Sequence, residues 1–178
     1  MTDGIFFDTD CLCAFLWVKE ENILAGLYPG RIVLPAQVYE ELKYVPHLLA
    51  QADRMLACGE ISTAGMEAGS VEFRDYLKMT TAGEGTVRVI GKGEAAAIAM
   101  AKERGGTLAS NNLRDVSWYA RKYRLSLITT GDILEEALRR QMITEAEGDC
   151  LWQKMIAKRR KLPTGSFSEY LALPKQGR

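Results

Sequence analysis

The chain has 178 residues, no net formal charge, an apolar fraction of 47% and a charged fraction of 26%. These values describe an ordinary globular protein, and the length suits one domain with a substantial core better than two domains. Because the charges balance, this composition is compatible with a nucleic-acid partner only through a local basic patch.

The N-terminal region carries Asp3, Asp8 and Asp10 and lacks the basic segment that begins a signal peptide. Its longest apolar run, residues 11–18, is far too short to cross a bilayer. We therefore expect a cytoplasmic protein with no membrane partner. The cysteines have neither the spacing nor the histidine partners of a zinc site, so we expect buried free thiols in a reducing compartment. They are Cys11, Cys13, Cys58 and Cys150.

The first half of the chain alternates short apolar strands with helices. Residues 5–7 form an apolar run typical of a buried strand, and residues 10–18 are predicted to form a helix with Asp10 near its start. The elements predicted next are a strand at residues 31–34, a helix opened by Pro35, a helix at residues 47–57, a strand at residues 61–64 and a helix at residues 71–79.

A glycine-containing segment, residues 80–93, separates this half from the second and is expected to be a flexible loop. The second half is predicted to contain helices at residues 94–104, 113–123 and 131–140 and strands at residues 107–109 and 125–128. This alternation predicts an α/β fold with a mostly parallel central sheet and helices on both faces. A long helix at residues 144–161 and a short one capped by Ser166 would form a C-terminal helical extension.

Acidic residues follow the strands or begin the helices of this pattern. Asp8 comes directly after the first strand, and Asp10 follows after one residue. Glu41, Glu94 and Asp115 occupy comparable places farther along. Because the carboxyl ends of parallel strands meet at one edge of a sheet, we expect these side chains to converge there. Two carboxylates 4 Å apart repel by roughly 4 kcal/mol at an effective dielectric constant of 20, so such a cluster would persist cheaply only with bound cations.

The absence of histidine from this set favours Mg²⁺ or Mn²⁺ over zinc. Each acid also has a purely structural explanation when it is considered alone. Asp10 could cap a helix, and Glu94 could be a first-turn acid that the helix dipole favours by about 0.3–1 kcal/mol. Glu41 could share a solvated helix face with Glu40, and Asp115 could be charge decoration at a helix start. Only the joint placement of the acids favours a site.

Four short segments resemble, in order and approximate spacing, the motifs of PIN domains, and in particular those of VapC-type toxin nucleases. They are residues 7–10, 34–42, 93–99 and 110–115, within a match that covers about residues 5–140. The resemblance implies a single PIN-like domain, residues 1–143, with residues 144–178 as an extension packed on it. It also implies a metal-dependent ribonuclease whose acidic residues are Asp8, Glu41, Glu94 and Asp115.

Within that resemblance, Asp8, Glu94 and Asp115 would bind the metal, and Glu40 would be the exposed neighbour of Glu41. The fourth motif departs from the family pattern, because Asn112 stands where many relatives carry aspartate. Metal binding would be weakened there unless Asp115 supplies the missing charge. The side chains expected to orient ligands or water are those of Ser110, Asn112 and Asp10.

The resemblance further implies products with a 5′-phosphate and a 3′-hydroxyl, a small antitoxin that covers the site, and a homodimer. Basic residues predicted to contact RNA are Arg114, Lys158, Arg159 and Arg160. The alternative for the last three, together with Lys154 and Lys161, is a helix end whose cations complement the dipole. The aromatic residues of the basic segment 114–124 are more typical of core or dimer contacts than of base stacking. They are Trp118, Tyr119 and Tyr123.

Two other functions are compatible with parts of this sequence. A haloacid-dehalogenase-like phosphatase would use Asp8 as nucleophile and Asp10 as general acid, but its later lysine and paired-acid motifs are not evident. A PIN-like RNA- or protein-binding module without catalysis is compatible with Asn112. His47 is the only histidine and no nucleophile elbow accompanies it, and residues 85–92 lack the spacing of a phosphate-binding loop.

Overall fold

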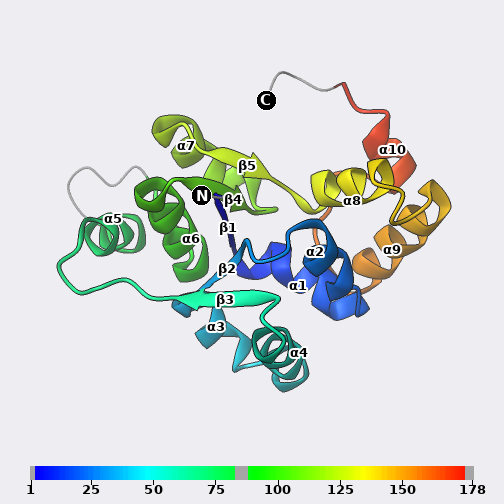
Figure 1. The fold of residues 1–178 in the computed structure, drawn as a ribbon. Coiled ribbons are helices and arrows are strands. Elements are labelled where there is room, and N and C mark those ends of the chain that lie inside the picture. Colours follow the sequence, from blue (N-terminus) through cyan, green and yellow to red (C-terminus); the bar gives the residue numbers. More distant parts are fainter. Residues whose placement is uncertain (1–2, 83–87, 175–178) are drawn as a thin grey trace.

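The computed structural model describes residues 3–82 and 88–174, and its centre is one parallel sheet (Figure 1). The strands are β1 (Gly4–Phe7), β2 (Ile32–Pro35), β3 (Ile61–Ala64), β4 (Gly106–Ala109) and β5 (Ser126–Ile128). They lie in the order β3-β2-β1-β4-β5, and every neighbouring pair is parallel. The predicted α/β architecture is confirmed, and β1 occupies the middle of the sheet.

Helices connect the strands and cover both faces of the sheet. They are α1 (Thr9–Val18), α2 (Glu21–Leu27), α3 (Ala36–Leu42), α4 (Pro46–Ala57), α5 (Val71–Thr80), α6 (Lys92–Arg104), α7 (Leu113–Tyr123), α8 (Thr130–Arg139), α9 (Glu145–Ala157) and α10 (Phe167–Leu171). Figure 1 shows α5, α6 and α7 on one side of the sheet and α1, α2, α8 and α9 on the other.

Alternating side chains of β1 divide the core into two layers. Ile5 and Phe7 belong to the larger cluster, which includes the apolar faces of α1, α4 and α8. Phe6 points into the smaller cluster, which is built mainly from the alanine-rich helix α6 with α5 and α7. This two-residue period is the ordinary geometry of a strand buried on both faces. Asp8, the next residue, therefore emerges at the carboxyl edge of the central strand.

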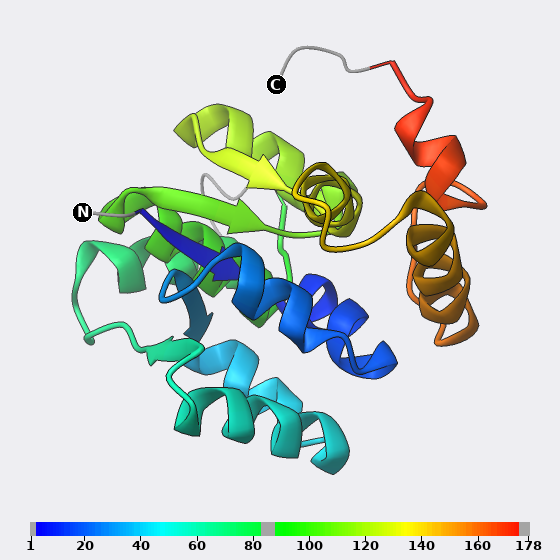
Figure 2. The same ribbon diagram turned by 45° about the vertical axis from the view of Figure 1, so that its right-hand side comes forward.

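The C-terminal extension is packed into the larger core cluster. Trp152 of α9 is fully buried, its Nε1 donates to the Thr164 carbonyl 2.9 Å away, and its ring lies against those of Phe167 and Tyr170. A Cβ atom at Gly148 would overlap the Phe167 ring, so glycine permits the close approach of α10 to α9. Figure 2 shows these two helices, in orange and red, side by side at one end of the sheet.

One helix was missed, and several boundaries differ by one or two residues from those predicted. α2 was not predicted, because it is only seven residues long and contains Gly26, although Ile23, Leu24 and Leu27 bury one side of it. α6 begins two residues early, at Lys92, and α5 extends to Thr80, so both shorten the predicted loop. Of that loop, residues 83–87 lie outside the described part of the chain.

The predicted helix at residues 144–161 is wrong at its C-terminal end. α9 stops at Ala157, and Arg159 adopts a left-handed conformation with φ of 60°. The Arg159 N–H then donates to the Ile156 carbonyl at 2.8 Å, and the Arg160 N–H donates to the Met155 carbonyl at 3.0 Å. This pair of hydrogen bonds is a common way to close a helix, usually with glycine at the left-handed position. The turn directs residues 158–161 away from the helix axis.

The prediction of buried cysteines is correct for Cys11 and Cys13 and wrong for Cys58 and Cys150, which are exposed. Cys58 caps the end of α4, and Cys150 lies on the outer side of α9. All four thiols are free. In the described residues, every helix is either too short or too polar to cross a membrane.

Candidate active site

Asp8 is the buried centre of an acidic site at the carboxyl edge of the sheet. It caps α1, and its Oδ1 accepts a hydrogen bond of 2.7 Å from the Cys11 N–H. Its Oδ2 is also buried and accepts no hydrogen bond from the described residues. Burial raises the pKa of Asp8 from 3.8 to about 7, and the nearby charges of Asp10 and Glu94 add to this rise. The Ser110 side chain and the Cys11 N–H oppose it.

Asp10 does not cap α1, as one sequence interpretation had it, because Asp8 takes that position. Asp10 lies in the first turn of α1, where its Oδ1 is 3.0 Å from Nη1 of Arg160. The turn after α9 therefore brings a cation to the acidic site, which the prediction of a simple helix-end charge for Arg160 did not include.

Glu41 links three elements of the site. It projects from α3 and accepts hydrogen bonds from the Thr9 hydroxyl and, at 3.0 Å, from the Gly93 N–H at the start of α6. A Cβ atom at Gly93 would lie 2.7 Å from Oγ1 of Thr9, so the approach of α6 to α1 requires glycine. Glu40 is exposed and pairs with Lys43, in agreement with the prediction for this pair of glutamates.

The side-chain amide of Asn112 bridges two of the acids. Its Nδ2 donates to Oε1 of Glu94 and to Oδ2 of Asp115, 2.7 Å from each. The backbone N–H of Asn112 donates to the Ser110 hydroxyl at 3.2 Å, so the turn after β4 holds the backbone from which this side chain projects. Burial raises the pKa of Glu94, the charges of Asp115 and Glu41 add to the rise, and the donors Asn112 and Gly91 oppose it.

Asp115 has a cationic partner that the sequence pattern did not indicate. Oδ1 of Asp115 lies 3.0 Å from Nη2 of Arg88, and Nη1 of the same guanidinium donates to the Arg114 carbonyl. Nothing in the local sequence marks Arg88, because it belongs to an irregular segment between α5 and α6. Thr9 was also missed, although its place between Asp8 and Asp10 was a usable signal.

The expectation that the cluster persists cheaply only with bound cations stays a prediction. Part of the negative charge already has partners, which are Arg160, Arg88, Asn112 and backbone N–H groups. Oδ2 of Asp8 is the one buried carboxylate oxygen of the site that meets neither a donor nor a cation among the described residues.

The donor set nevertheless fits a hard divalent cation. Asp8 offers a free buried oxygen, the carboxylate of Glu94 is close enough to raise its pKa, and all other available ligands are oxygen atoms. In residues 3–82 and 88–174, no three acidic, cysteine or histidine side chains are arranged so that together they could hold a metal ion. Any ion bound here would therefore take fewer than three of these side chains as they stand and would keep several waters, as Mg²⁺ usually does.

The predicted residues fall into two groups. One is joined at this edge by the contacts above and comprises Asp8, Asp10, Glu41, Glu94, Ser110, Asn112, Asp115 and Arg160. In the other, Arg114 is exposed on α7, Arg159 is exposed in the turn after α9, and Nζ of Lys158 lies 5.6 Å from the Trp17 ring centroid.

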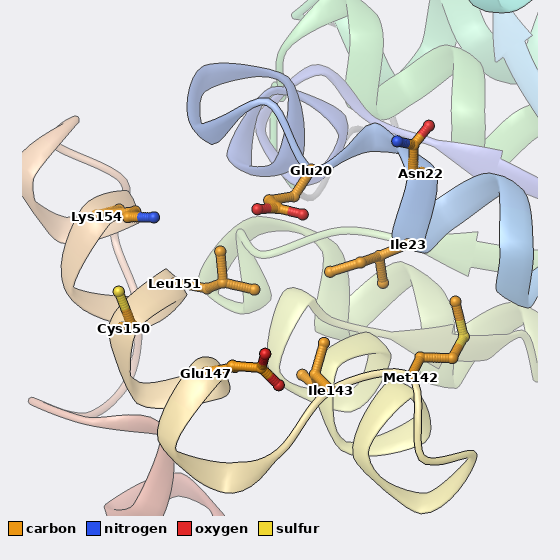
Figure 3. Close-up of a pocket in the computed structure, with 9 residues that line it drawn as sticks. All are labelled: Glu20, Asn22, Ile23, Met142, Ile143, Glu147, Cys150, Leu151 and Lys154. Atoms are coloured by element: carbon orange, nitrogen blue, oxygen red, sulfur yellow. The ribbon is translucent and has the colours of Figure 1, made fainter.

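A separate hollow of about 460 Å³ contains none of the predicted site residues. Figure 3 shows it between the start of α2, the α8–α9 connection and α9. Ile23, Ile143 and Leu151 give it an apolar floor, and charged side chains including Glu147 and Lys154 stand around it. Its lining offers no cluster of carboxylates, so the chemistry of the chain is expected at the sheet edge.

Comparison with known proteins agrees with this geometry. The model of the DUF3368 family, described as a PIN domain, matches residues 5–175. Neither the curated proteins nor the solved structures yield a match. The matched range includes α9 and α10, which the sequence resemblance over residues 5–140 left outside. Because the match covers almost the whole chain and the sheet has the expected parallel form, the chain belongs to the PIN-domain family.

Proposed function

We propose that this protein is a divalent-metal-dependent ribonuclease that hydrolyses phosphodiester bonds within RNA. PIN domains are generally metal-dependent nucleases. The observation that carries the proposal is Oδ2 of Asp8, a buried carboxylate oxygen that accepts no well-formed hydrogen bond, although the Ser110 side chain is close enough to lower the pKa of Asp8. It also lies close to the charge of Glu94. Such an oxygen is costly to bury, so a cation is the partner that best fits it.

In this proposal Asp8, Glu94 and Asp115 hold Mg²⁺ or Mn²⁺. When bound, the ion supplies a water of lowered pKa and stabilises negative charge on the phosphate. Asn112 keeps Glu94 and Asp115 at a fixed separation through its two hydrogen bonds. Glu41 keeps the starts of α1 and α6 together and adds negative charge beside Glu94. Ser110 orients Asn112.

In this proposal two guanidinium groups receive the RNA backbone. Arg88 pairs with Asp115, and Arg160 pairs with Asp10. Arginine forms strong charge-assisted hydrogen bonds with phosphate oxygens. We infer that they position the phosphate over the carboxylates and neutralise the charge that develops there. Lys158, Arg159 and Arg114 would extend the basic border.

The finer identity follows the resemblance to VapC-type proteins. We propose products with a 5′-phosphate and a 3′-hydroxyl, a cytoplasmic location, a homodimer, and a role as the toxin of a toxin–antitoxin pair. A small antitoxin-like reading frame beside the gene would support that role. The family match supports neither a haloacid-dehalogenase-like phosphatase nor a module without catalysis.

The test is RNA cleavage by the purified protein with Mg²⁺, with Mn²⁺ and with EDTA. We expect cleavage with either ion, none with EDTA, and loss of cleavage in Asp8→Asn. This variant keeps the helix cap, since asparagine caps helices as well as aspartate does. Asp53→Asn, an exposed aspartate outside the site, is the matched control and should cleave normally. Undiminished cleavage by Asp8→Asn would remove Asp8 from the mechanism. Phosphate release from p-nitrophenyl phosphate without RNA cleavage would favour the phosphatase.

A further inference from the structure

The outer side of α7 connects the acidic site with a strongly basic surface. Arg114, Trp118 and Lys122 follow one another at four-residue intervals and are all exposed, so they form one row along the helix. Arg121 is exposed beside that row, and Arg88 lies at its beginning. We call these five residues the α7 surface.

The α7 surface begins at the acidic site itself. Arg88 contacts Asp115 through Nη2 and the Arg114 carbonyl through Nη1, at 3.0 Å in each case. Asp115 is in turn held by Asn112, which also contacts Glu94. A polymer that places one phosphate at the carboxylates can therefore continue directly along α7.

Arg88 pairs with Asp115, but the other three cations of this surface have no acidic partner in the described part of the chain. Among residues 3–82 and 88–174, no ion pair involves Arg114, Arg121 or Lys122. Asp115, at the site end, is the only acid within α7. Since the whole chain has no net charge, this row is a local concentration of cations and has the electrostatic character of a phosphate-binding surface.

Trp118 gives this basic row a flat aromatic face. Its side chain is 38% exposed, and Nζ of Lys122 lies 4.7 Å from its ring centroid. The ring stands edge-on against the buried Tyr119, with centroids 4.8 Å apart, which limits its movement. Tyr119 makes core contacts, as expected for the aromatic residues of this segment, whereas Trp118 faces outward. The Lys122 ammonium stands over this ring, so a base that stacks there takes its place and leaves the ammonium to contact a neighbouring phosphate.

We propose that the α7 surface binds the single-stranded RNA next to the cleaved phosphate, with one unpaired base stacked on Trp118. Arg114, Arg121 and Lys122 contact the neighbouring phosphates. This inference rests on the proposed nuclease function and specifies its substrate as unpaired RNA, because a base within a duplex cannot reach the ring. The segment from Asp115 to Lys122 is about 10 Å long at 1.5 Å per residue, the length of roughly three nucleotides.

RNA fits this surface better than a protein partner does. A protein interface is depleted of lysine and of unpaired charge at its centre, whereas here cations surround one aromatic ring. Nucleic acid supplies the complementary charge at every residue. A second copy of the chain would bring the same cations into contact with each other if the row paired with itself.

The test measures binding separately from cleavage. Fluorescence anisotropy with a short fluorescein-labelled RNA is recorded in EDTA, with single-stranded and duplex forms. We expect Trp118→Ala to weaken single-strand binding by about 5- to 100-fold and Trp118→Phe to retain most of it. The double variant Arg121→Ala/Lys122→Ala should weaken binding and reduce the salt dependence of log K by about 0.7 per cation removed. Tyr44→Ala changes an 88% exposed aromatic residue in the connection between α3 and α4, two helices that Figure 1 shows apart from α7, and should bind like the wild type.

An abasic scan locates the stacked base. Removing the base that contacts Trp118 should weaken binding as much as Trp118→Ala does, and combining the two changes should add little. Thermal unfolding of each variant shows that the fold is kept.

The outcomes separate the two proposals. RNA binding that depends on Trp118, without any cleavage by the wild type, supports the α7 surface and rules out the nuclease function. Normal cleavage with unchanged RNA binding in both variants overturns the α7 surface and leaves the nuclease function standing. If the variants bind RNA like the wild type but sediment differently from it, the proposal is also overturned. The surface then contacts a second copy of the chain.

Discussion

Nη1 of Arg160 lies 3.0 Å from Oδ1 of Asp10, although 150 positions separate the two residues along the chain. The left-handed turn at Arg159 directs this guanidinium from the end of α9 to the start of α1. The C-terminal extension is therefore part of the site, in accordance with the family match to residue 175.

Replacement of Arg160 tests the contribution of this extension. Arg160→Ala should lower kcat/KM for RNA cleavage by about 10- to 100-fold, the value of one charge-assisted hydrogen bond to phosphate. Arg160→Lys should recover part of the loss. The midpoint of thermal unfolding should change little, because partly exposed ion pairs contribute at most about 1 kcal/mol. Lys161→Ala removes a neighbouring exposed charge and should be neutral. Equal losses in the two alanine variants would contradict a specific role for Arg160.

Asp8 predicts an unusual dependence of stability on pH in the metal-free protein. Its pKa rises from 3.8 to about 7 on folding, so the folded state binds the proton more tightly. The stabilisation from that proton is complete below pH 3.8 and is lost as the pH rises through 7. In EDTA, Asp8→Asn should therefore be more stable than the wild type at pH 8, by up to about 4 kcal/mol. The difference should shrink toward pH 4.

Urea unfolding at several pH values measures this difference, with Asp53→Asn as the exposed control. A less stable Asp8→Asn protein at pH 8 would contradict the conclusion that burial dominates the environment of Asp8. Saturating Mg²⁺ or Mn²⁺ should stabilise the wild type and leave Asp8→Asn unchanged, because a ligand that binds only the folded state raises its stability.

Asn112→Asp tests the amide that bridges Glu94 and Asp115. The substitution removes two hydrogen bonds and places a third carboxylate between two others. In EDTA we expect a loss of about 1–3 kcal/mol in the free energy of unfolding. Titration calorimetry should show tighter Mn²⁺ binding than in the wild type. Asn112→Ala loses the same hydrogen bonds without adding charge, so it should be destabilised without gaining affinity for the ion. Tighter binding in both variants would argue against a charge effect.

Gly93→Ala tests the close approach of α6 to α1. The added Cβ would lie 2.7 Å from Oγ1 of Thr9 and 3.2 Å from both carboxylate oxygens of Glu41. We expect a loss of about 1–3 kcal/mol in stability and reduced cleavage. Gly65→Ala is the matched control, since a Cβ there meets nothing within 4 Å. Wild-type stability in Gly93→Ala would mean that α6 can shift without cost.

The sequence was informative wherever an acid directly follows an apolar strand or begins a helix. Asp8, Glu94 and Asp115 could be placed together because a parallel sheet brings such points to one edge. Arg88 and the ion pair of Arg160 could not be predicted, because their positions depend on irregular backbone. A left-handed arginine has no sequence signal comparable to that of glycine.

The exposure of some single residues was not deduced from the sequence. Trp118 and Tyr119 are adjacent aromatic residues, yet only Tyr119 is buried. The helical spacing of Val116, Tyr119 and Ala120 places Tyr119 on the buried side of α7, so the periodicity carried a usable signal. Cys58 and Cys150 were wrongly expected to be buried, because that expectation came from residue type and not from helical position.

The parallel topology places helix beginnings, as well as carboxylates, at the same rim. N–H groups from the first turn of α1 and from the start of α6 donate to Asp8, Glu94 and Glu41. Each helix beginning contributes roughly half a positive charge, which a chelator cannot remove. The polypeptide is thus expected to reach its final shape without any ion and to bind ions only afterwards. A zinc finger differs, because its shape depends on its metal.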